Sequence, residues 1–294
     1  MPPSDKTLVQ YNSILRRLEE AEITAESLVS EPEKCLTWIR EFASPSKSVG
    51  TINNFLKAVL WKLREDNMEG ATEPYVLEMK KNKPSLDIQK KIQDLPEHRK
   101  EKMLSWPEVL ALGEKAKKEL SAENYLIYCL YTMMPPLRAD YSEIVVRKSR
   151  NTISCHTNHL IALQDTKKYQ FVLNRYKTAE TYGTVCLDIP EPLAKIIKEW
   201  LLSRVPTPEN GKKKQIPYSS PFLEVNTPNA LTKRVRSIFK QLCGKEMGIG
   251  LLRHSYIQHF LSVKRTLLER EEIAKKMLHS AVVQELYDVI EDSE

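Results

Sequence analysis

The stretch Leu251-Leu252-Arg253-His254-Ser255-Tyr256 places a charged pair inside a largely apolar helical pattern. Because a buried guanidinium is costly unless it is paired, Arg253 is expected to have a structural or functional partner. The phrase Met277-Leu278-His279-Ser280 follows, and Tyr287 lies eight residues beyond His279. An arginine on one helix, a histidine that begins the next and a tyrosine near the C-terminus can converge on one phosphate group.

The composition is that of an ordinary globular protein. The chain of 294 residues is long enough for two domains with their own cores, and 41% of its residues are hydrophobic. Forty-five Lys and Arg residues against 39 Asp and Glu residues give a net charge of +6, which permits a polyanionic partner without requiring one. No apolar run approaches the roughly 20 residues that span a bilayer, and the polar start lacks the apolar core of a signal peptide. We therefore expect no membrane partner and no secretion.

The cysteines indicate a reducing, intracellular environment. Their number is odd, they are widely spaced, and no C-x-x-C pair suggests a zinc or redox site. They stand at Cys35, Cys129, Cys155, Cys186 and Cys243. The sequence also has no carboxylate cluster and no glycine-rich phosphate loop, so we expect no metal or nucleotide cofactor.

The N-terminal part has a helical pattern. Apolar residues recur at three- and four-residue steps between Thr7 and about Asn67, and breakers at 30–32 and 44–48 separate three helices. The next stretch is basic, poor in large apolar residues and broken by prolines, as a linker is. We predict a helical domain over 1–79, a linker over 80–103 and a second domain over 104–294.

The second domain is predicted to begin with helices. Ser105 followed three residues later by Glu108 is a capping box ahead of an apolar-periodic run. Another helix is predicted over about 124–134. Later helices are predicted at about 192–204, 228–243, 251–263, 269–278 and 282–290, with Thr227 and Gly244 capping the second of these.

A small antiparallel sheet is predicted between these helices. The β-branched and aromatic runs that indicate its strands cover 152–154, 160–163, 169–173 and 184–189. The segment 174–183 joins the last two strands and is predicted to be a hairpin tip that holds Lys177. Together these elements predict a mainly α protein with a small antiparallel β-sheet.

Each candidate residue also has a structural interpretation. A buried Arg253 can form a salt bridge, and His254 can fix its helix through backbone bonds. Arg138 and Lys177 can be solvated surface cations, and Tyr287 can be an amphipathic core residue. Singly these signals are weak, whereas their order along the chain is specific.

That order, Arg138, Lys177 on a hairpin, Arg253-His254, His279 and Tyr287, resembles the catalytic residues of the tyrosine recombinase family, which includes the lambda-type phage integrases. The resemblance covers about 104–292 and is strongest over 248–290. The N-terminal helices more loosely resemble the family's core-binding domain, which clamps the opposite face of DNA. Three phrases are more similar to the recombinases of large DNA viruses and their mobile elements: Pro135-Pro136-Leu137-Arg138, Tyr176-Lys177-Thr178 and Met277-Leu278-His279-Ser280.

The resemblance implies a site-specific recombinase or integrase with a helical core-binding domain and an α+β catalytic domain. Tyr287 would attack DNA and form a 3′-phosphotyrosine, while Lys177 would protonate the leaving oxygen. Arg138, Arg253 and His279 would stabilise the charged phosphate.

Supporting and DNA-contacting residues follow from the same resemblance. His254 would support the site, and an acid would orient Arg138, with Asp140 and Glu143 as the two alternatives. DNA contacts are expected from Arg175, Lys80, Lys81 and Lys83. The implied partner is double-stranded DNA, bound by a homotetramer that is a monomer or weak dimer when free. The chain would act wherever that DNA is: the host nucleus, a cytoplasmic virus factory or the virion.

Gly250 is the main departure from the family pattern. The family has a histidine or lysine three residues before the second arginine, where this chain has Gly250. His279, Lys177 or water can take the proton of the tyrosine, or the reaction can proceed without a dedicated base. Two other functions also fit: a type IB topoisomerase that relaxes DNA, and a recombinase-derived DNA-binding protein that has lost catalysis.

Overall fold

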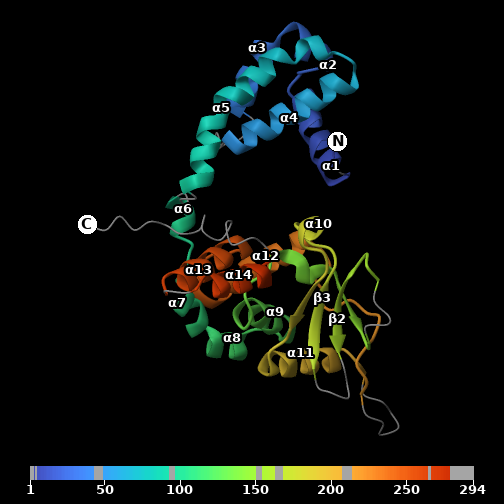
Figure 1. The fold of residues 1–294 in the computed structure, drawn as a ribbon, viewed down its shortest axis with the longest axis vertical. Coiled ribbons are helices and arrows are strands. Elements are labelled where there is room, and N and C mark those ends of the chain that lie inside the picture. The colour runs from blue at the N-terminus through green and yellow to red at the C-terminus, as the bar shows by residue number, and fades with distance from the viewer. Residues whose placement is uncertain are drawn as a thin grey trace, which may run out of the picture. The chain divides into compact units, whose positions relative to one another are not determined.

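The chain divides into two compact units, Met1–Gln93 and Asp94–Glu294, which we call the N-terminal and C-terminal units (Figure 1). A computed structural model describes residues 3, 5–42, 49–92, 97–149, 154–162, 168–206, 214–263 and 266–278. Among these residues no helix is both long and apolar enough to cross a membrane.

The N-terminal unit is a bundle of helices around a central helix, α4. Its elements are α1 (Asp5–Glu19), α2 (Ala25–Ser30), α3 (Pro32–Phe42), α4 (Val49–Glu65), the short 3-10 helix η1 (Glu69–Ala71) and α5 (Glu73–Ile92). Helix α4 packs against α1 and α5 and buries Phe55, Leu56 and Val59. The first predicted helical segment is divided, because Glu22 takes a left-handed φ of 61° and Thr24 caps α2. The all-helical character predicted for this part is confirmed.

Helix α5 corrects the predicted linker. We predicted a linker over 80–103, whereas α5 continues to Ile92 and includes Pro84. Lysine, leucine and glutamine are good helix formers, so a polar run can extend a helix that begins at an apolar contact such as buried Tyr75. Lys80, Lys81 and Lys83 are therefore exposed residues of a helix.

The C-terminal unit combines helices with one sheet. Its helices are α6 (Glu97–Lys100), α7 (Trp106–Ala111), α8 (Gly113–Glu119), α9 (Ala122–Thr132), the 3-10 helix η2 (Ala139–Glu143), α10 (Ala179–Tyr182), α11 (Glu191–Ser203), α12 (Pro228–Cys243), α13 (Ile249–Leu261) and α14 (Leu267–Lys276). The predicted caps are present: Glu108 Oε2 lies 2.7 Å from both Ser105 N and Ser105 Oγ, and Gly244 ends α12 with a φ of 77°. The helix predicted at 282–290 lies outside the described residues.

The sheet has four strands in the order β1 (Ile144–Arg147), β2 (Asn158–Ala162), β3 (Tyr169–Leu173) and β4 (Val185–Asp188). The fold class is confirmed: mainly α with one small sheet. The sheet is mixed rather than purely antiparallel, because β1 runs parallel to β2 while the other pairs are antiparallel. Strand β1 was not predicted, although its Ile-Val-Val run has the β-branched residues that favour strands. Of the predicted strand at 152–154, residues 152 and 153 lie outside the described residues.

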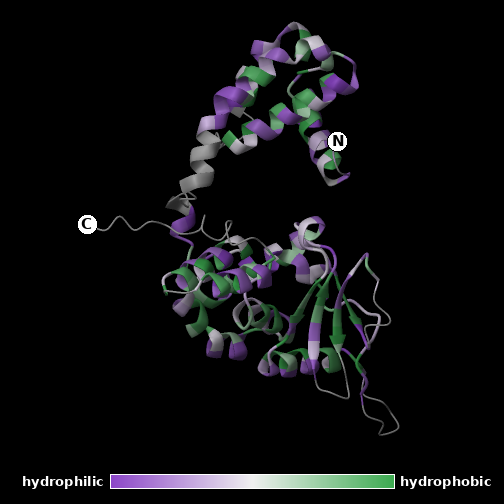
Figure 2. Cartoon of the chain, in the orientation of Figure 1, coloured by the Kyte–Doolittle hydropathy of each residue, from purple (hydrophilic) through white to green (hydrophobic). Residues whose placement is uncertain are grey.

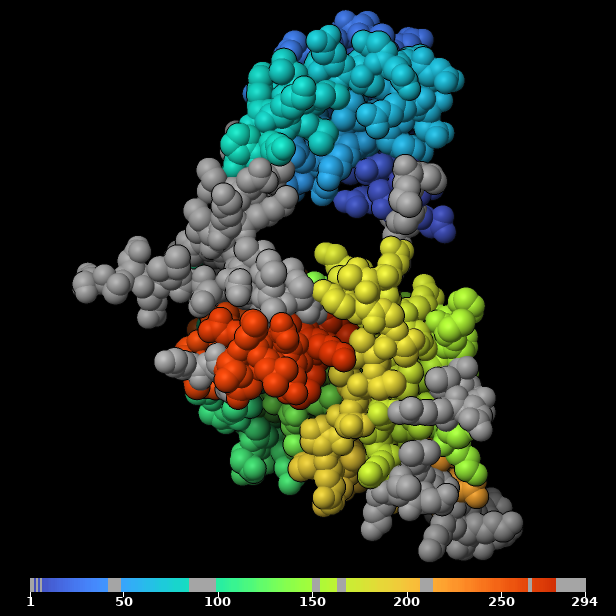
Figure 3. All heavy atoms as spheres, in the orientation of Figure 1, coloured from blue at the N-terminus to red at the C-terminus, as the bar shows by residue number. Residues whose placement is uncertain are grey.

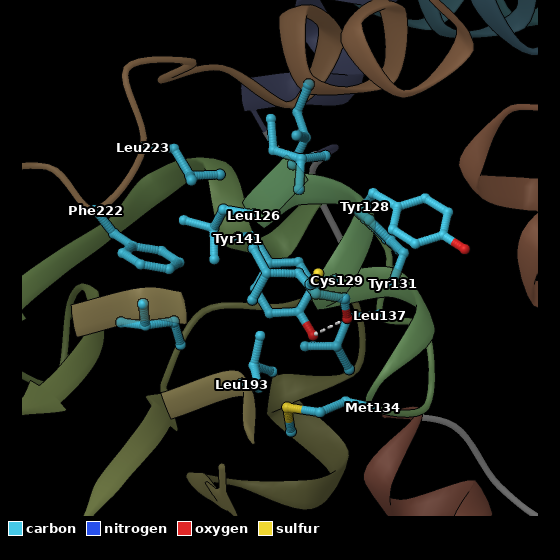
Figure 4. Packing of buried hydrophobic residues seen from close by; sticks show 14 of the residues in the cluster. Leu126, Tyr128, Cys129, Tyr131, Met134, Leu137, Tyr141, Leu193, Phe222 and Leu223 are labelled. Carbon is cyan, nitrogen blue, oxygen red and sulfur yellow. Dashed lines mark hydrogen bonds between the residues drawn. The ribbon is translucent and has the colours of Figure 1, made fainter. Parts of the chain in front are cut away.

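The core of the C-terminal unit lies between the sheet and the helices α9, α11 and α12. Hydrophobic residues run along β2 and β3 (Figure 2), and every residue of β2 is buried. Figure 4 shows Leu126 and Tyr131 of α9 packed with Leu137 and Tyr141, all fully or almost fully buried. Since Leu137 precedes Arg138 directly, the core fixes the backbone from which Arg138 projects.

Replacing a core leucine should cost far more stability than replacing an exposed one in the same unit. Leu126 is 0% exposed and Leu268 is 68% exposed. Leu126→Ala should lower the free energy of unfolding by about 2–5 kcal/mol, because it leaves a cavity. Leu268→Ala should change it by less than about 0.5 kcal/mol. Urea denaturation of both variants measures the difference, and equal losses would contradict this core.

Candidate functional site

Arg253 is a buried cation in the middle of α13. Arg253 is only 3% exposed. Nη1 donates to the carbonyl of Pro136 at 2.5 Å, and Nη2 donates to the carbonyl of Met277 at 3.3 Å. The guanidinium therefore joins three separate parts of the chain: α13, the segment after α9 and the end of α14.

The Pro136 contact places Arg253 beside the segment that carries Arg138. Arg138 is half-buried at the start of η2, and its carbonyl accepts a hydrogen bond from Tyr131 Oη at 2.8 Å. Tyr131 is 1% exposed in α9, so the core holds the Arg138 backbone, while Arg253 holds the backbone two residues earlier at Pro136. The two arginines predicted from the sequence thus come from segments that contact each other directly.

Asp140 and Glu143, the two candidate acids, differ in burial: Asp140 is half-buried and Glu143 is exposed. Burial raises the pKa of the Asp140 carboxyl, and the positive charges of Arg138 and Arg253 partly oppose that rise. An acid whose charge is felt by both guanidiniums lies close to both. Glu143, at the end of η2, is exposed. Of the two alternatives, Asp140 is therefore the acid whose carboxyl group the charges of both arginines affect.

The predicted hairpin tip joins β3 to β4 and belongs to the yellow part of the surface in Figure 3. Lys177, within this tip, is exposed. A buried side chain, Asn158, holds its base. Asn158 Oδ1 accepts the backbone N–H groups of Asn174 and Arg175 at 2.9 and 2.8 Å, and Asn158 Nδ2 donates to the Arg175 carbonyl at 2.8 Å. Three bonds to one buried amide fix the backbone two residues before Lys177.

Thr178 connects this tip to the end of α14. Its Oγ1 donates to the carbonyl of Leu278 at 2.9 Å. Leu278 is 3% exposed and takes a left-handed φ of 58°, a conformation that costs a non-glycine residue roughly 1–2 kcal/mol. The contacts of Thr178 and of the core compensate for that strain. They hold the backbone at the residue directly before His279.

Some of the predicted site residues lie on segments that contact one another, and others lie outside the described residues. Arg253 bonds the backbone at Met277 and also the carbonyl of Pro136, two residues before Arg138, and Thr178 next to Lys177 bonds the backbone at Leu278. His279 and Tyr287 lie outside the described residues. Lys80, Lys81 and Lys83 belong to the N-terminal unit.

His254 follows Arg253 and is 9% exposed. Burial, with a smaller effect from the positive charge of Arg99, lowers its pKa to about 4. The imidazole is therefore neutral near pH 7. In the same helix Gly250 is exposed, and Nη2 of Arg99 lies 3.5 Å from the position that a Cβ atom on Gly250 would take.

Three contributors were missed by the sequence analysis: Asn158, Thr178 and Arg99. Thr178 was quoted only as part of the phrase around Lys177, and Arg99 only as part of a basic run. Nothing in the sequence distinguishes Asn158, because its partners come from the pairing of β2 with β3. Position relative to Lys177 was the only signal that could have identified Thr178.

The lowered pKa of His254 should make stability depend on pH. As pH falls from 6.5 towards 4, the unfolded chain binds a proton at His254 that the folded chain does not bind, so stability is lost across that window. The loss is about 1.4 kcal/mol for each pH unit. His254→Gln should reduce this slope in urea denaturation measured between pH 7 and about pH 4. Identical slopes in both proteins would contradict the assignment.

Comparisons with known proteins give little. No protein-family model matches the chain, and no curated protein matches it in sequence. Among solved structures, the crystal structure of XerA recombinase is similar with a TM-score of 0.40 and 14% sequence identity, over 99% of this chain and 89% of that chain. The function is therefore inferred from the residues of the site.

Proposed function

We propose that this protein is a site-specific DNA recombinase or integrase that cuts and rejoins DNA through a 3′-phosphotyrosyl bond. One observation carries the proposal: Arg253 bonds both the segment beside Arg138 and the backbone at Met277, and Thr178, next to Lys177, bonds the backbone at Leu278. Three segments that carry cations far apart in the sequence thus converge near the residues that lead into His279. A cluster of this kind suits a phosphate whose charge increases during reaction.

The proposed reaction is a transesterification at phosphorus. The phenol oxygen of Tyr287 forms a bond to phosphorus, and the bond from phosphorus to the 5′ oxygen breaks. Lys177 gives a proton to that leaving oxygen, which departs as a hydroxyl. The 5′ hydroxyl of a partner strand then attacks the phosphotyrosine and releases Tyr287, so the number of phosphodiester bonds is conserved.

Arg138 and Arg253 have complementary roles in this scheme. A guanidinium carries five N–H donors in a rigid fork, which lets one arginine hold backbone and bind phosphate together. Arg253 is buried, where its charge acts in a low dielectric, and Arg138 is half-buried beside Asp140. We propose that His279 adds a third contact to the phosphate and that Asp140 orients Arg138.

The proposed partner is double-stranded DNA. Arg175 flanks Lys177 and is exposed on the tip, and Lys80, Lys81 and Lys83 are exposed on α5. We propose that both sets contact backbone phosphates, which makes affinity fall steeply as salt rises. A homotetramer on two duplexes is the proposed assembly, since strand exchange needs a partner strand cut at the same time.

Removing the proposed nucleophile should abolish covalent capture of DNA. The probe sequence is first selected from a randomised pool of DNA duplexes by binding to the protein. A duplex of that sequence is then synthesised with a nick near the cleavage site. The short strand released by cleavage diffuses away, so the covalent adduct accumulates. Wild-type protein should form an adduct that survives denaturing electrophoresis, and Tyr287→Phe should form none. An adduct with Tyr287→Phe overturns the proposal. Specific binding with no adduct from either protein indicates a DNA-binding protein without catalysis, and relaxation of supercoiled plasmid lacking the site indicates a topoisomerase.

The reaction rate lost when the proposed proton donor is removed should be restored by replacing the leaving oxygen atom with sulfur. Lys177→Ala should slow adduct formation by about 100- to 10,000-fold. A thiol is far more acidic than an alcohol, so a duplex with sulfur in place of the 5′ bridging oxygen needs no donor and should restore the rate. Arg175→Ala removes a cation from the same tip and is the matched control, since the sulfur substrate should not rescue it. Failure of the sulfur to rescue Lys177→Ala contradicts the role of Lys177.

A further inference from the structure

The first turns of α13 present one face that combines Gly250, Arg253 and His254. Residues three and four apart on a helix are neighbours on its surface, so Arg253 and His254 both flank the position of Gly250. Arg253 and His254 are buried, whereas Gly250 is exposed. Because glycine has no side chain, α13 itself supplies no functional group at the exposed position 250.

The space over Gly250 is covered by an arginine from a distant part of the chain. Nη2 of Arg99 lies 3.5 Å from the position of a Cβ atom on Gly250, which is ordinary van der Waals contact. Arg99 belongs to α6, at the beginning of the C-terminal unit and far from Gly250 in the sequence. The guanidinium therefore lies in contact with the place where a side chain on Gly250 would begin.

The positive charge of Arg99 acts on the site residue His254. Among the described residues no acid forms an ion pair with Arg99. His254, one turn along α13 from Gly250, is affected by that charge, since Arg99 contributes to the lowering of its pKa. By contrast, Arg236 covers neighbouring Gly248 but acts on the carboxylate of Glu246.

We propose that Arg99 is a further catalytic residue, which places a permanent positive charge over Gly250 and binds the scissile phosphate beside Arg253. This inference rests on the proposed function. A guanidinium cannot serve as a base near neutral pH, because it does not lose its proton. Arg99 therefore acts by electrostatic stabilisation, and proton transfer remains with other groups.

The placement has a consequence for the design of variants. A lysine at position 250 begins next to the place that the Arg99 guanidinium occupies, so it can return a cation to the same region from α13 itself. Replacing glycine in a helix also raises helix propensity, so the substitution does not threaten folding. Gly250→Ala gives the same helical gain without a charge. The pair Gly250→Lys and Gly250→Ala thus separates charge from helix stability.

The experiment measures the rate of adduct formation on the selected, nicked duplex. Arg99→Ala should slow the reaction at least about tenfold, since a cation acting on a developing anion is lost. Arg99→Ala with Gly250→Lys should recover most of the rate, and Arg99→Ala with Gly250→Ala should not. Lys102→Ala removes one cation from the same exposed segment and should leave the rate within about twofold of wild type.

Two results overturn the role of Arg99: a wild-type rate in Arg99→Ala, or equal recovery by alanine and lysine at position 250. A sulfur leaving group should also fail to rescue Arg99→Ala, because Arg99 donates no proton. Rescue would reassign Arg99 as the donor and contradict electrostatic stabilisation.

A second measurement separates this inference from the proposed function. The pKa of His254, followed by NMR, should rise in Arg99→Ala and fall again when Gly250→Lys is added. An unchanged His254 pKa overturns the placement of Arg99 over α13, whatever the protein does to DNA. If wild-type protein forms no adduct, the proposed function fails and the catalytic role of Arg99 fails with it, while a shifted pKa still supports the cation at this place.

Discussion

The C-terminal unit depends on one buried guanidinium. Arg253 is 3% exposed and bonds the carbonyls of Pro136 and Met277. A buried permanent charge is tolerated only when it has hydrogen-bond partners, and a buried carbonyl group is costly without a donor. The guanidinium and the two carbonyl groups therefore require each other. Losing the guanidinium would leave two acceptors unsatisfied and would release both the segment before Arg138 and the end of α14. The same contact that stabilises the fold therefore also gathers the candidate site.

A second set of contacts brings the hairpin tip to this centre. Asn158 fixes the tip backbone with three hydrogen bonds, and Thr178 bonds the carbonyl of Leu278. Lys177 lies between these anchored points, with its own side chain exposed. Such an arrangement suits a long side chain that must reach a bound molecule while its backbone stays in place. The tip therefore combines a rigid base with an exposed cation.

Much of the helical structure could be predicted from the sequence, because periodicity and caps are local. Thr227 and Gly244 bound α12 as predicted. The sheet was harder: β1 is short, and its parallel partner β2 comes only after a long connection, which no local pattern specifies. The linker was misjudged because a polar run can be either coil or helix. For the site, residue types indicated Arg138, Lys177 and Arg253, whereas Asn158, Thr178 and Arg99 act through contacts that exist only in the folded chain.

We propose that Arg138, Lys177 and Arg253 act on one phosphate. The most direct test of this proposal is a crystal structure of the protein bound to a nicked duplex with orthovanadate, which mimics a five-coordinate phosphate. We expect vanadium bonded to Tyr287 Oη, with Arg138, Arg253 and Lys177 all within hydrogen-bond distance of the vanadate oxygens. A vanadate or DNA backbone bound away from these three cations would contradict it.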